Sequence, residues 1–373
     1  MTTPTEIYSP GLEGVIAGET AISTVTGGLC YRGYPVTELA EKSTFDEVAY
    51  LLLHGELPTR SQLTELQKRL AAAQKLPSVL SDLLKRLPKD GIPMDVLRTG
   101  VSMLAHYDPE VGSRAANLRK AERLLAQIPL IIAEYYRATS GQPAVPPKPE
   151  LGFAANMLYM LRGTPASALD AKAFDVSLIL YAEHEFNAST FAARVVCSTE
   201  SDLHASITAA ISALKGRLHG GANEKVMDML LATGGPDKAE GWIRSALARK
   251  EKVMGFGHRV YKHGDVRAKV LKEFSIRAAQ RAGTTQWESA AEIIETVLEA
   301  EKNLFPNLDW PAGRLYHALG LEVPLYTPFF VASRVTGWAA HVIEQMENNR
   351  IIRPRGRYTG PEERHMTPIE HRG

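Results

Sequence analysis

Cysteine is scarce in this sequence, which contains only Cys30 and Cys197 among its 373 residues. So few cysteines in a chain of this length argue against a disulfide framework and against a metal site built from several thiolates. A reducing, cytoplasmic setting fits this composition best.

An excess of charge of either sign is also missing. The chain has 43 basic and 42 acidic residues, a formal net charge of +1. The composition therefore indicates neither a nucleic acid nor an anionic membrane as a partner. An anionic ligand must instead be captured by a local cluster of Arg, Lys or His side chains, or by a helix N-terminus.

Long apolar runs are absent as well. The most apolar stretch, Leu124 to Ala133, is interrupted by Gln127 and Pro129, whereas a membrane-spanning helix needs about 20 apolar residues. The first residues, Met1 to Ser9, lack a basic region followed by an apolar segment. We therefore expect neither a signal peptide nor a membrane span.

Apolar residues at spacings of three and four are present almost throughout, which is the pattern of amphipathic helices. After the N-cap candidate Asp202, for example, Leu203, Ile207, Ile211 and Leu214 follow this spacing. The pattern predicts helices at residues 44–54, 61–74, 93–106, 116–137, 149–160, 170–182, 188–197, 203–214, 221–231, 238–250, 290–304 and 327–347.

Strand signals are few, and they predict short strands only near the N-terminus, at residues 14–16, 20–22 and 28–31. The predicted fold class is therefore all-α with a minor β element. A length of 373 residues favours two domains over one. The proline-rich stretch from Gly141 to Pro149 predicts a surface loop.

A first candidate for chemistry is His219, which is followed by Gly220 and Gly221 and then at once by a predicted helix. The partial positive charge of a helix N-terminus disfavours imidazolium, so His219 is expected to stay neutral and to donate a hydrogen bond to a developing enolate oxygen. The alternative from this tract alone is a histidine that merely caps a turn.

A second candidate is Asp309, a carboxylate among the apolar residues Phe305, Leu308 and Trp310 on a predicted turn. Apolar surroundings raise a carboxyl pKa toward the range useful for a general base. The alternative role for Asp309 is a helix N-cap.

Further along, Arg334 lies in an otherwise apolar helix that we expect Thr327 to cap and Pro328 to open. A buried arginine needs an anion, which is either a structural carboxylate or a ligand carboxylate held by two hydrogen bonds. Arginines 350, 353, 355 and 357 follow as a basic segment, which is a solvated tail by default and can otherwise reach a neighbouring subunit.

Two other tracts combine histidine with turn residues. In Gly255 to Lys262, the two glycines beside Phe256 let the backbone approach a ligand closely, but the tract matches neither the Walker pattern nor the dinucleotide-binding fingerprint. In Tyr181 to Thr190, His184 has no second histidine at the spacing of a zinc site. A metal role is therefore not expected, and His184 can donate to a ligand carbonyl or carboxylate.

Six blocks, taken in order, resemble the citrate synthase family: EHEFNAST, KGRLHGGANE, GFGHRVYK with Asp265 and Arg267 behind it, PNLDW, SRVTGWAAHVIEQ and IIRPR. The resemblance runs from about residue 8 to residue 360. It implies a condensation of acetyl-CoA with oxaloacetate, followed by hydrolysis of citryl-CoA to citrate and CoA. Acetyl-CoA is then a substrate, and no bound cofactor is expected.

Carried over by position, the resemblance implies that His219 stabilises the acetyl-CoA enol, Asp309 removes the methyl proton and His258 protonates the oxaloacetate carbonyl. Oxaloacetate itself would be held by His184, Arg267, Arg334 and Arg353, the last from the other subunit of a homodimer. CoA would contact Val253, Met254, Gly255, Phe256, Gly257 and Lys262.

The same resemblance implies a large helical domain formed by residues 1–217 and 318–373, with a small helical domain, residues 218–317, inserted between them. The chain lacks the longer N-terminal region of the hexamer-forming, allosteric members, so regulation by NADH is not expected. Closure of the small domain would exclude water from the reacting thioester.

Two departures from the family pattern concern the acyl pocket. Val266 stands where the family usually has proline, and Trp310 to Gly313 replaces the usual residues after the catalytic aspartate. Trp310 and the helix around Arg334 resemble the 2-methylcitrate synthase branch, which uses propionyl-CoA, whereas Leu315 to Gly320 resembles the citrate branch. We favour citrate and keep 2-methylcitrate as the alternative. A non-enzymatic helical scaffold and a metal-dependent hydrolase are the remaining alternatives.

Overall fold

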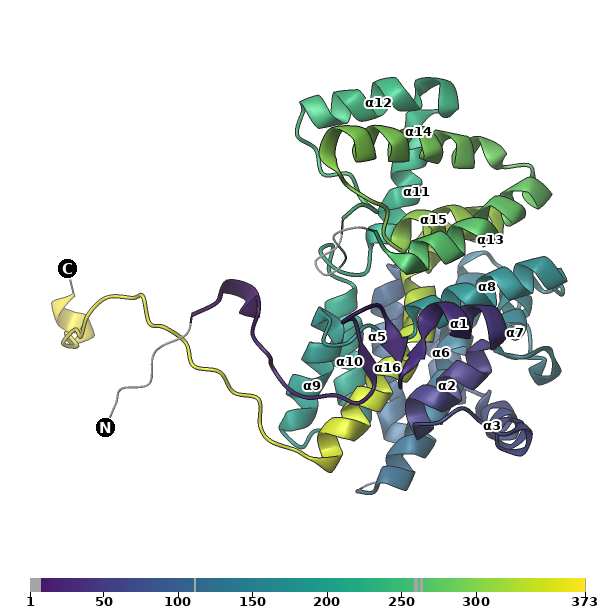
Figure 1. The fold of residues 1–373 in the computed structure, drawn as a ribbon. Helices are drawn as coiled ribbons and strands as arrows, with labels where there is room; N and C mark the ends of the chain where they lie inside the picture. The colour runs from purple at the N-terminus through teal and green to yellow at the C-terminus, as the bar shows by residue number, and fades with distance from the viewer. Residues whose placement is uncertain (1–7, 111, 258–260, 262–263, 373) are drawn as a thin grey trace.

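The computed structural model describes residues 8–110, 112–257, 261 and 264–372. Within these residues the chain forms sixteen α-helices and one small sheet, so the predicted all-α class is confirmed. Helices α1 to α10 and α16 form the lower body in Figure 1, and helices α11 to α15 gather above it.

The helices of the lower body are α1 Val36–Lys42, α2 Phe45–His54, α3 Arg60–Ala73, α4 Ser78–Arg86, α5 Pro93–Leu104, α6 Arg114–Thr139, α7 Phe153–Arg162, α8 Ala168–Tyr181, α9 Ala188–Ser198, α10 Leu203–Leu214 and α16 Tyr326–Glu347. Those above it are α11 Ala222–Thr233, α12 Pro236–Ala248, α13 Val266–Ala282, α14 Thr285–Lys302 and α15 Asp309–Ala318. Short 3-10 turns lie at Pro10–Leu12, Ala105–Tyr107, Pro149–Leu151, Val323–Leu325 and Ile369–His371.

Helix α16 lies at the centre of the lower body and packs against α2, α6, α8, α9 and α10. Every residue from Tyr326 to Ile343 is buried, as expected of a helix that is apolar on all sides. Arg334 and His341 are the two basic residues among these buried positions, and each requires a partner because a buried polar group without one is costly.

Helices α11 to α15 pack mainly on one another, and they meet the lower body through α13 on α8 and through α11 on α16. This lobe corresponds in sequence to the small domain expected at residues 218–317. The boundaries of that division stay a prediction.

The sheet is smaller than the predicted strands. Strands β1 Ser23–Thr24, β2 Cys30–Tyr31 and β3 Tyr34–Pro35 pair antiparallel in the order β1-β2-β3, with Ser23 opposite Tyr31 and Cys30 opposite Pro35. The strand expected at residues 14–16 is wrong, because Gly14 has a φ of 74° in a turn and Ile16 is 90% exposed. In place of the strand expected at residues 20–22, strand β1 begins at Ser23.

Two helix N-termini illustrate capping by side chains close to them in the sequence, and a prediction of this kind at a third helix is wrong. Thr44 forms a capping box with Glu47 at α2, and Asp202 caps α10 as predicted. The prediction that Thr327 caps α16 is wrong, because the helix begins one residue earlier. The hydroxyl of Thr327 instead donates to Oε1 of Glu224 on α11.

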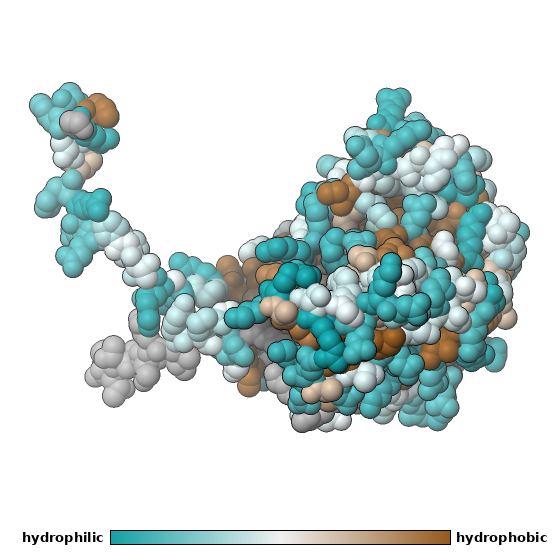
Figure 2. Space-filling model, turned by 90° about the horizontal axis from the view of Figure 1, so that it is seen from above, coloured by the Kyte–Doolittle hydropathy of each residue, from teal (hydrophilic) through white to brown (hydrophobic). Residues whose placement is uncertain are grey.

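After α16 the chain leaves the body as an almost entirely exposed arm, residues 349–372 (Figure 1). The arm passes the N-terminal segment, where the Arg357 guanidinium lies 5.0 Å from the ring centre of Tyr8. Figure 2 shows the arm projecting from the main body. Among the described residues, no helix is long and apolar enough to cross a bilayer.

Candidate active site

Arg334 comes from the buried central helix and is 2% exposed. Its Nε donates to the carbonyl oxygen of Tyr181 at 2.6 Å, and its guanidinium lies 4.7 Å from the ring centre of Phe330. Burial lowers the pKa of Arg334 to about 10, so it stays charged at neutral pH. Within the described part of the chain no carboxylate forms an ion pair with it. The charge of the Glu183 carboxylate opposes this lowering of the Arg334 pKa without a direct ion pair.

Arg267 is also buried, but it has a partner in the chain. Its Nε and Nη2 donate to Asp265 Oδ1 and Oδ2 at 3.0 and 2.8 Å, and this carboxylate raises the pKa of Arg267 even though burial opposes the charge. Asp265 also caps α13 and accepts from the Leu308 N–H at 3.2 Å. The arginine is thereby fixed beside the residue that precedes Asp309.

Asp309 is the first residue of α15 and is not its N-cap, which is Leu308. Its Oδ1 accepts a hydrogen bond from the Tyr181 hydroxyl at 2.6 Å. Asp309 is half-buried, and desolvation by the surrounding protein raises its pKa to about 6, while the Tyr181 hydroxyl and the charge of Arg267 oppose that rise. This value suits a general base near neutral pH.

His219 lies in the tight turn between α10 and α11. The Gly220 N–H donates to the Leu214 carbonyl at 2.9 Å, and a Cβ on Gly220 would collide with that oxygen, so glycine is required there. Burial, and then the charge of Arg334, lower the pKa of His219 to about 4. The imidazole is therefore neutral at working pH, as predicted from the sequence.

The helix N-terminus that His219 contacts is that of α9, whereas the sequence had indicated the helix that follows it. Nε2 of His219 lies 3.3 Å from the Ser189 backbone nitrogen and 2.8 Å from Ser189 Oγ, in the first turn of α9. A backbone N–H can only donate, so Nε2 accepts and the proton of the neutral ring sits on Nδ1. Nδ1–H is the donor left for a ligand oxygen.

Phe330 on α16 joins these groups into one site. Its ring centre lies 4.3 Å from that of Tyr181 and 6.5 Å from that of His219, and Arg334 stacks on it. Phe330 thus packs near the neutral imidazole and the buried guanidinium, and it reaches Asp309 through Tyr181. Such groups can act as a hydrogen-bond donor, an anion receptor and a base.

His184 joins the site through Tyr261. Its Nε2 lies 3.0 Å from the Tyr261 hydroxyl, and Arg267 lies 5.7 Å from the Tyr261 ring centre. The structure therefore brings together His184 and Arg267, two of the four residues predicted to hold a 2-oxo acid. Arg353 is exposed on the arm after α16, and His258 and Lys262 lie outside the described residues.

The glycine tract before His258 is bound to the segment before Asp309. The Gly257 N–H donates to the Phe305 carbonyl, and the Asn307 N–H donates to the Gly255 carbonyl, each at 2.9 Å. Gly255 has a φ of 84°, and a Cβ there would lie 2.9 Å from the Trp310 ring. Val253 and Phe256 are mostly buried and Met254 is partly buried.

Comparison with known proteins agrees with this geometry. Residues 11–355 match the family described as citrate synthase, C-terminal domain. This chain belongs to the citrate synthase family. It is 46% identical to citrate synthase 2 of Bacillus subtilis over 97% of this chain and 98% of that protein. It is also 46% identical to a 2-methylcitrate synthase of Mycobacterium tuberculosis, over 98% of this chain and 94% of that protein.

Among solved structures, the fold is similar to a citrate synthase of Thermoplasma acidophilum in a ternary complex with carboxymethyl coenzyme A and oxaloacetate. The TM-score is 0.94 and the identity 34%, over 99% of this chain and all of that one. The family and the fold are thereby shown, and the names of the relatives divide between citrate synthase and 2-methylcitrate synthase.

Sequence reasoning missed three residues of this candidate site: Tyr181, Ser189 and Phe330. Tyr181 and Ser189 lie within the tract around His184, and Phe330 precedes Arg334 by one helical turn. The signal available was proximity to predicted residues, but only the folded chain shows that Tyr181 touches Asp309 and Ser189 touches His219.

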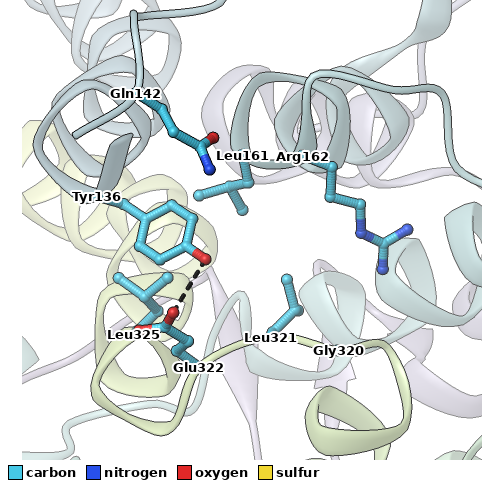
Figure 3. Close-up of a pocket in the computed structure, with 8 residues that line it drawn as sticks. All are labelled: Tyr136, Gln142, Leu161, Arg162, Gly320, Leu321, Glu322 and Leu325. Atoms are coloured by element: carbon cyan, nitrogen blue, oxygen red, sulfur yellow. Dashed lines mark hydrogen bonds between the residues drawn. The ribbon is translucent and has the colours of Figure 1, made fainter. Parts of the chain in front are cut away.

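A pocket of about 200 Å³ lies elsewhere in the molecule, between α6, α7 and the turn before α16 (Figure 3). Arg162 lines it, and the Tyr136 hydroxyl donates to Glu322 there at 3.1 Å. None of the predicted catalytic or substrate-binding residues lines this pocket, so we place the active site around Phe330. Among the described residues, no group of three or more His, Cys, Asp or Glu side chains is arranged to hold a metal ion.

Proposed function

We propose that this member of the citrate synthase family condenses acetyl-CoA with oxaloacetate and hydrolyses the citryl-CoA product to citrate and CoA. The observation that carries the proposal is the pairing of Asp309, whose pKa is about 6, with a neutral His219 that keeps only Nδ1–H to donate. Removing a proton from a thioester methyl group needs such a base together with a donor for the enolate oxygen.

In the proposed reaction, Asp309 takes a methyl proton from acetyl-CoA while His219 Nδ1–H donates to the thioester oxygen. The resulting enol carbon attacks the oxaloacetate carbonyl carbon, and His258 gives a proton to the new alkoxide. Water then cleaves the thioester, which releases CoA. The charged Arg334 and Arg267 support this scheme, because a dianionic substrate needs cationic partners in a site that excludes water.

The wider architecture belongs to the same proposal. The lobe of α11 to α15 would be the small domain, residues 218–317, which closes over the substrates and carries both His219 and Asp309. Arg353 would reach the site of the other subunit in a homodimer, which fits its exposed position on the arm after α16. The glycine tract at residues 253–257, together with Lys262, would contact CoA.

The alternative substrate is propionyl-CoA, which would make the chain a 2-methylcitrate synthase. It is favoured by the relatives of that name and by the buried Trp310, which follows the base directly and packs against Phe256 with ring centres 4.5 Å apart. One methyl group in an apolar pocket is worth only about 1–3 kcal/mol, so a dual activity is also consistent with this site.

The test is the initial rate of CoA release with oxaloacetate, measured as kcat/KM for acetyl-CoA and propionyl-CoA on the same preparation. A preference for acetyl-CoA supports citrate synthase, and a preference for propionyl-CoA moves the chain to 2-methylcitrate synthase. No release with either substrate would sink the proposal.

Two controls separate this proposal from its rivals. His219→Ala and Asp309→Ala should fold normally and lose turnover by orders of magnitude. A rate retained in both variants would favour a non-enzymatic scaffold. Full activity after exhaustive chelation would remove a metal-dependent hydrolase, whereas activity lost on chelation and restored by metal would favour it.

A further inference from the structure

A chain of buried polar residues lies behind the site, between α9, α16 and the segment that carries His184. Glu183 and His341 are fully buried, and Arg194 is 4% exposed. His341 Nε2 lies 2.8 Å from Glu183 Oε1, and His341 Nδ1 lies 2.7 Å from Arg194 Nη1. Arg194 Nη1 also donates to Glu344 at 2.8 Å.

The positions of the protons in this series of hydrogen bonds follow from the two groups that flank His341, which are Arg194 and Glu183. A guanidinium can only donate, so Nδ1 of His341 accepts from Arg194 and carries no proton. His341 therefore donates its Nε2–H to Glu183, which is an ionised acceptor. Burial would raise the pKa of Glu183, but His341, Arg334 and the Ser23 hydroxyl outweigh burial and hold it below its usual range.

Glu183 fixes the segment around it from several sides. Its Oε1 also accepts from Ser23 Oγ at 3.0 Å, and Ser23 Oγ in turn accepts from the Glu185 N–H at 3.0 Å. The Glu183 carbonyl accepts from the Tyr31 hydroxyl at 3.0 Å. Glu185 adopts a φ of 52°, a backbone conformation that costs energy in a residue other than glycine. The contacts of Glu183 and Ser23 hold the backbone in this bend.

The position of Glu183 in the sequence connects these hydrogen bonds to the candidate active site. Glu183 directly precedes His184 and lies two residues after Tyr181, whose carbonyl accepts from Arg334 Nε and whose hydroxyl donates to Asp309. Both the expected ligand His184 and the anchor of Arg334 therefore depend on where this backbone lies. A shift of about 1 Å in such groups is enough to weaken binding greatly.

We propose that Glu183, His341 and Arg194 are positioning residues that hold Tyr181 and His184 in place for binding of the 2-oxo acid. The proposal rests on the proposed function in its choice of oxaloacetate as ligand. These residues act through the Glu183 carboxylate, because that side chain belongs to the segment that carries His184 and is hydrogen-bonded to Ser23 and His341. Arg194 acts one step further away, by fixing which nitrogen of His341 carries the proton.

Two substitutions of the same histidine give a matched test. In His341→Gln the side-chain amide can reach the place of Nε2 and donate to Glu183, but it loses Arg194. In His341→Asn the shorter amide keeps an acceptor for Arg194 and no longer reaches Glu183. Each variant loses one buried hydrogen bond, so the two should lose similar stability.

The measurement is the Kd for oxaloacetate by calorimetry without acyl-CoA, together with the KM values for both substrates and thermal unfolding. His341→Asn and Glu183→Gln should weaken oxaloacetate binding about tenfold or more, as expected for loss of a buried charged hydrogen bond. His341→Gln should stay within about threefold of the unmodified protein. The KM for acyl-CoA should change little in all three. Val342→Ala removes buried volume from the same interface without touching the chain, and should lower stability alone.

Equal oxaloacetate Kd values in His341→Asn and His341→Gln, with equal losses of stability, would overturn the positioning role and leave a structural one. The positioning role also fails if Val342→Ala weakens oxaloacetate binding as much as His341→Asn does. If the unmodified protein binds oxaloacetate but releases no CoA, the proposed condensation fails, while the Kd values still decide this inference.

Discussion

Asp309 and Tyr181 form the contact in the site whose effect on proton transfer is easiest to isolate. The Tyr181 hydroxyl stabilises the ionised carboxylate, so Tyr181→Phe should raise the pKa of Asp309 above its present value of about 6. Because the base acts only when ionised, the acidic limb of the kcat/KM profile should move up by about one pH unit. Tyr135→Phe, a substitution in α6 away from the site, should leave the profile unchanged. An unmoved limb in Tyr181→Phe would remove Asp309 as the base.

Asp309 should also carry a cost in stability that depends on pH. Its folded pKa of about 6 lies above the ordinary value of 3.8, so folding favours the protonated carboxyl, and that preference is lost as the pH rises through 6. Asp309→Asn should therefore stabilise the protein by about 3 kcal/mol at pH 8 and by about half of that at pH 5, while abolishing turnover. Urea unfolding at both pH values measures the difference. Equal effects at pH 5 and pH 8 would contradict the raised pKa.

Single residues also show what the sequence could and could not predict. His219, Asp309 and Arg334 were found from their neighbours in the chain and from the family resemblance. The sequence predicted a neutral His219 from the charge of a helix N-terminus, whereas burial and the charge of Arg334 lower its pKa. The helix that contacts its ring is α9, which lies 30 residues upstream at Ser189. No local pattern encodes a contact across that distance.

At the level of elements, two helical glycines offer a matched comparison. A Cβ at Gly337 in α16 would collide with Glu183 Oε2 and lie 2.5 Å from the Ala182 carbonyl, whereas a Cβ at Gly241 in α12 meets nothing within 4 Å. Gly241→Ala should stabilise the protein by about 0.5–1 kcal/mol through helix propensity. Gly337→Ala should destabilise it by about 2 kcal/mol or more through overpacking.

Denaturant unfolding of the two glycine variants tests this prediction, and CoA release adds a second readout. Because the Gly337 Cβ would press on the segment next to His184, Gly337→Ala should also raise the KM for oxaloacetate. A neutral effect on both stability and KM would mean that α16 and this segment are free to move apart.

Most of the helices were predicted from their apolar spacing, and four of them were missed. The predicted helix at residues 188–197 and the observed α9 share their first residue. The short α1 and α4 were not predicted, nor were α13 and α15. Helix α15 contains Pro311 and Gly313, and its first turn is held by contacts with Asn307 and Tyr181 rather than by an N-cap side chain. Tertiary contacts override local propensity in such an element.

For the whole molecule, the arm after α16 predicts that two chains share one site. Arg353→Ala and His219→Ala should each be inactive or nearly so, but mixed dimers would contain one site with both residues intact. Random assortment should restore about a quarter of the sites. CoA release after the two variants are refolded together measures this, with each variant refolded alone as control. No recovery would place Arg353 in the site of its own chain or outside catalysis.

The arrangement of the two lobes could not be predicted from the spacing of apolar residues. Amphipathic spacing predicts that helices exist, but it does not say which helices pack together, and the division at residues 218 and 317 came from the family resemblance. The contacts between Glu224 on α11 and Thr327 on α16, and between α13 and α8, join residues about 100 positions apart. Sequence separation of that size leaves no local signal.

The hydrogen bonds between the glycine tract and the segment before Asp309 have a practical consequence for engineering. Backbone hydrogen bonds join the expected CoA loop, at Gly255 and Gly257, to the segment before the proposed base, at Phe305 and Asn307. The Trp310 ring fills the space that a side chain at position 255 would need. Chimeras with other members of the family should therefore exchange residues 253–257 and 305–310 together. A graft of either segment alone would pair residues from two different proteins and could lose the packing between them.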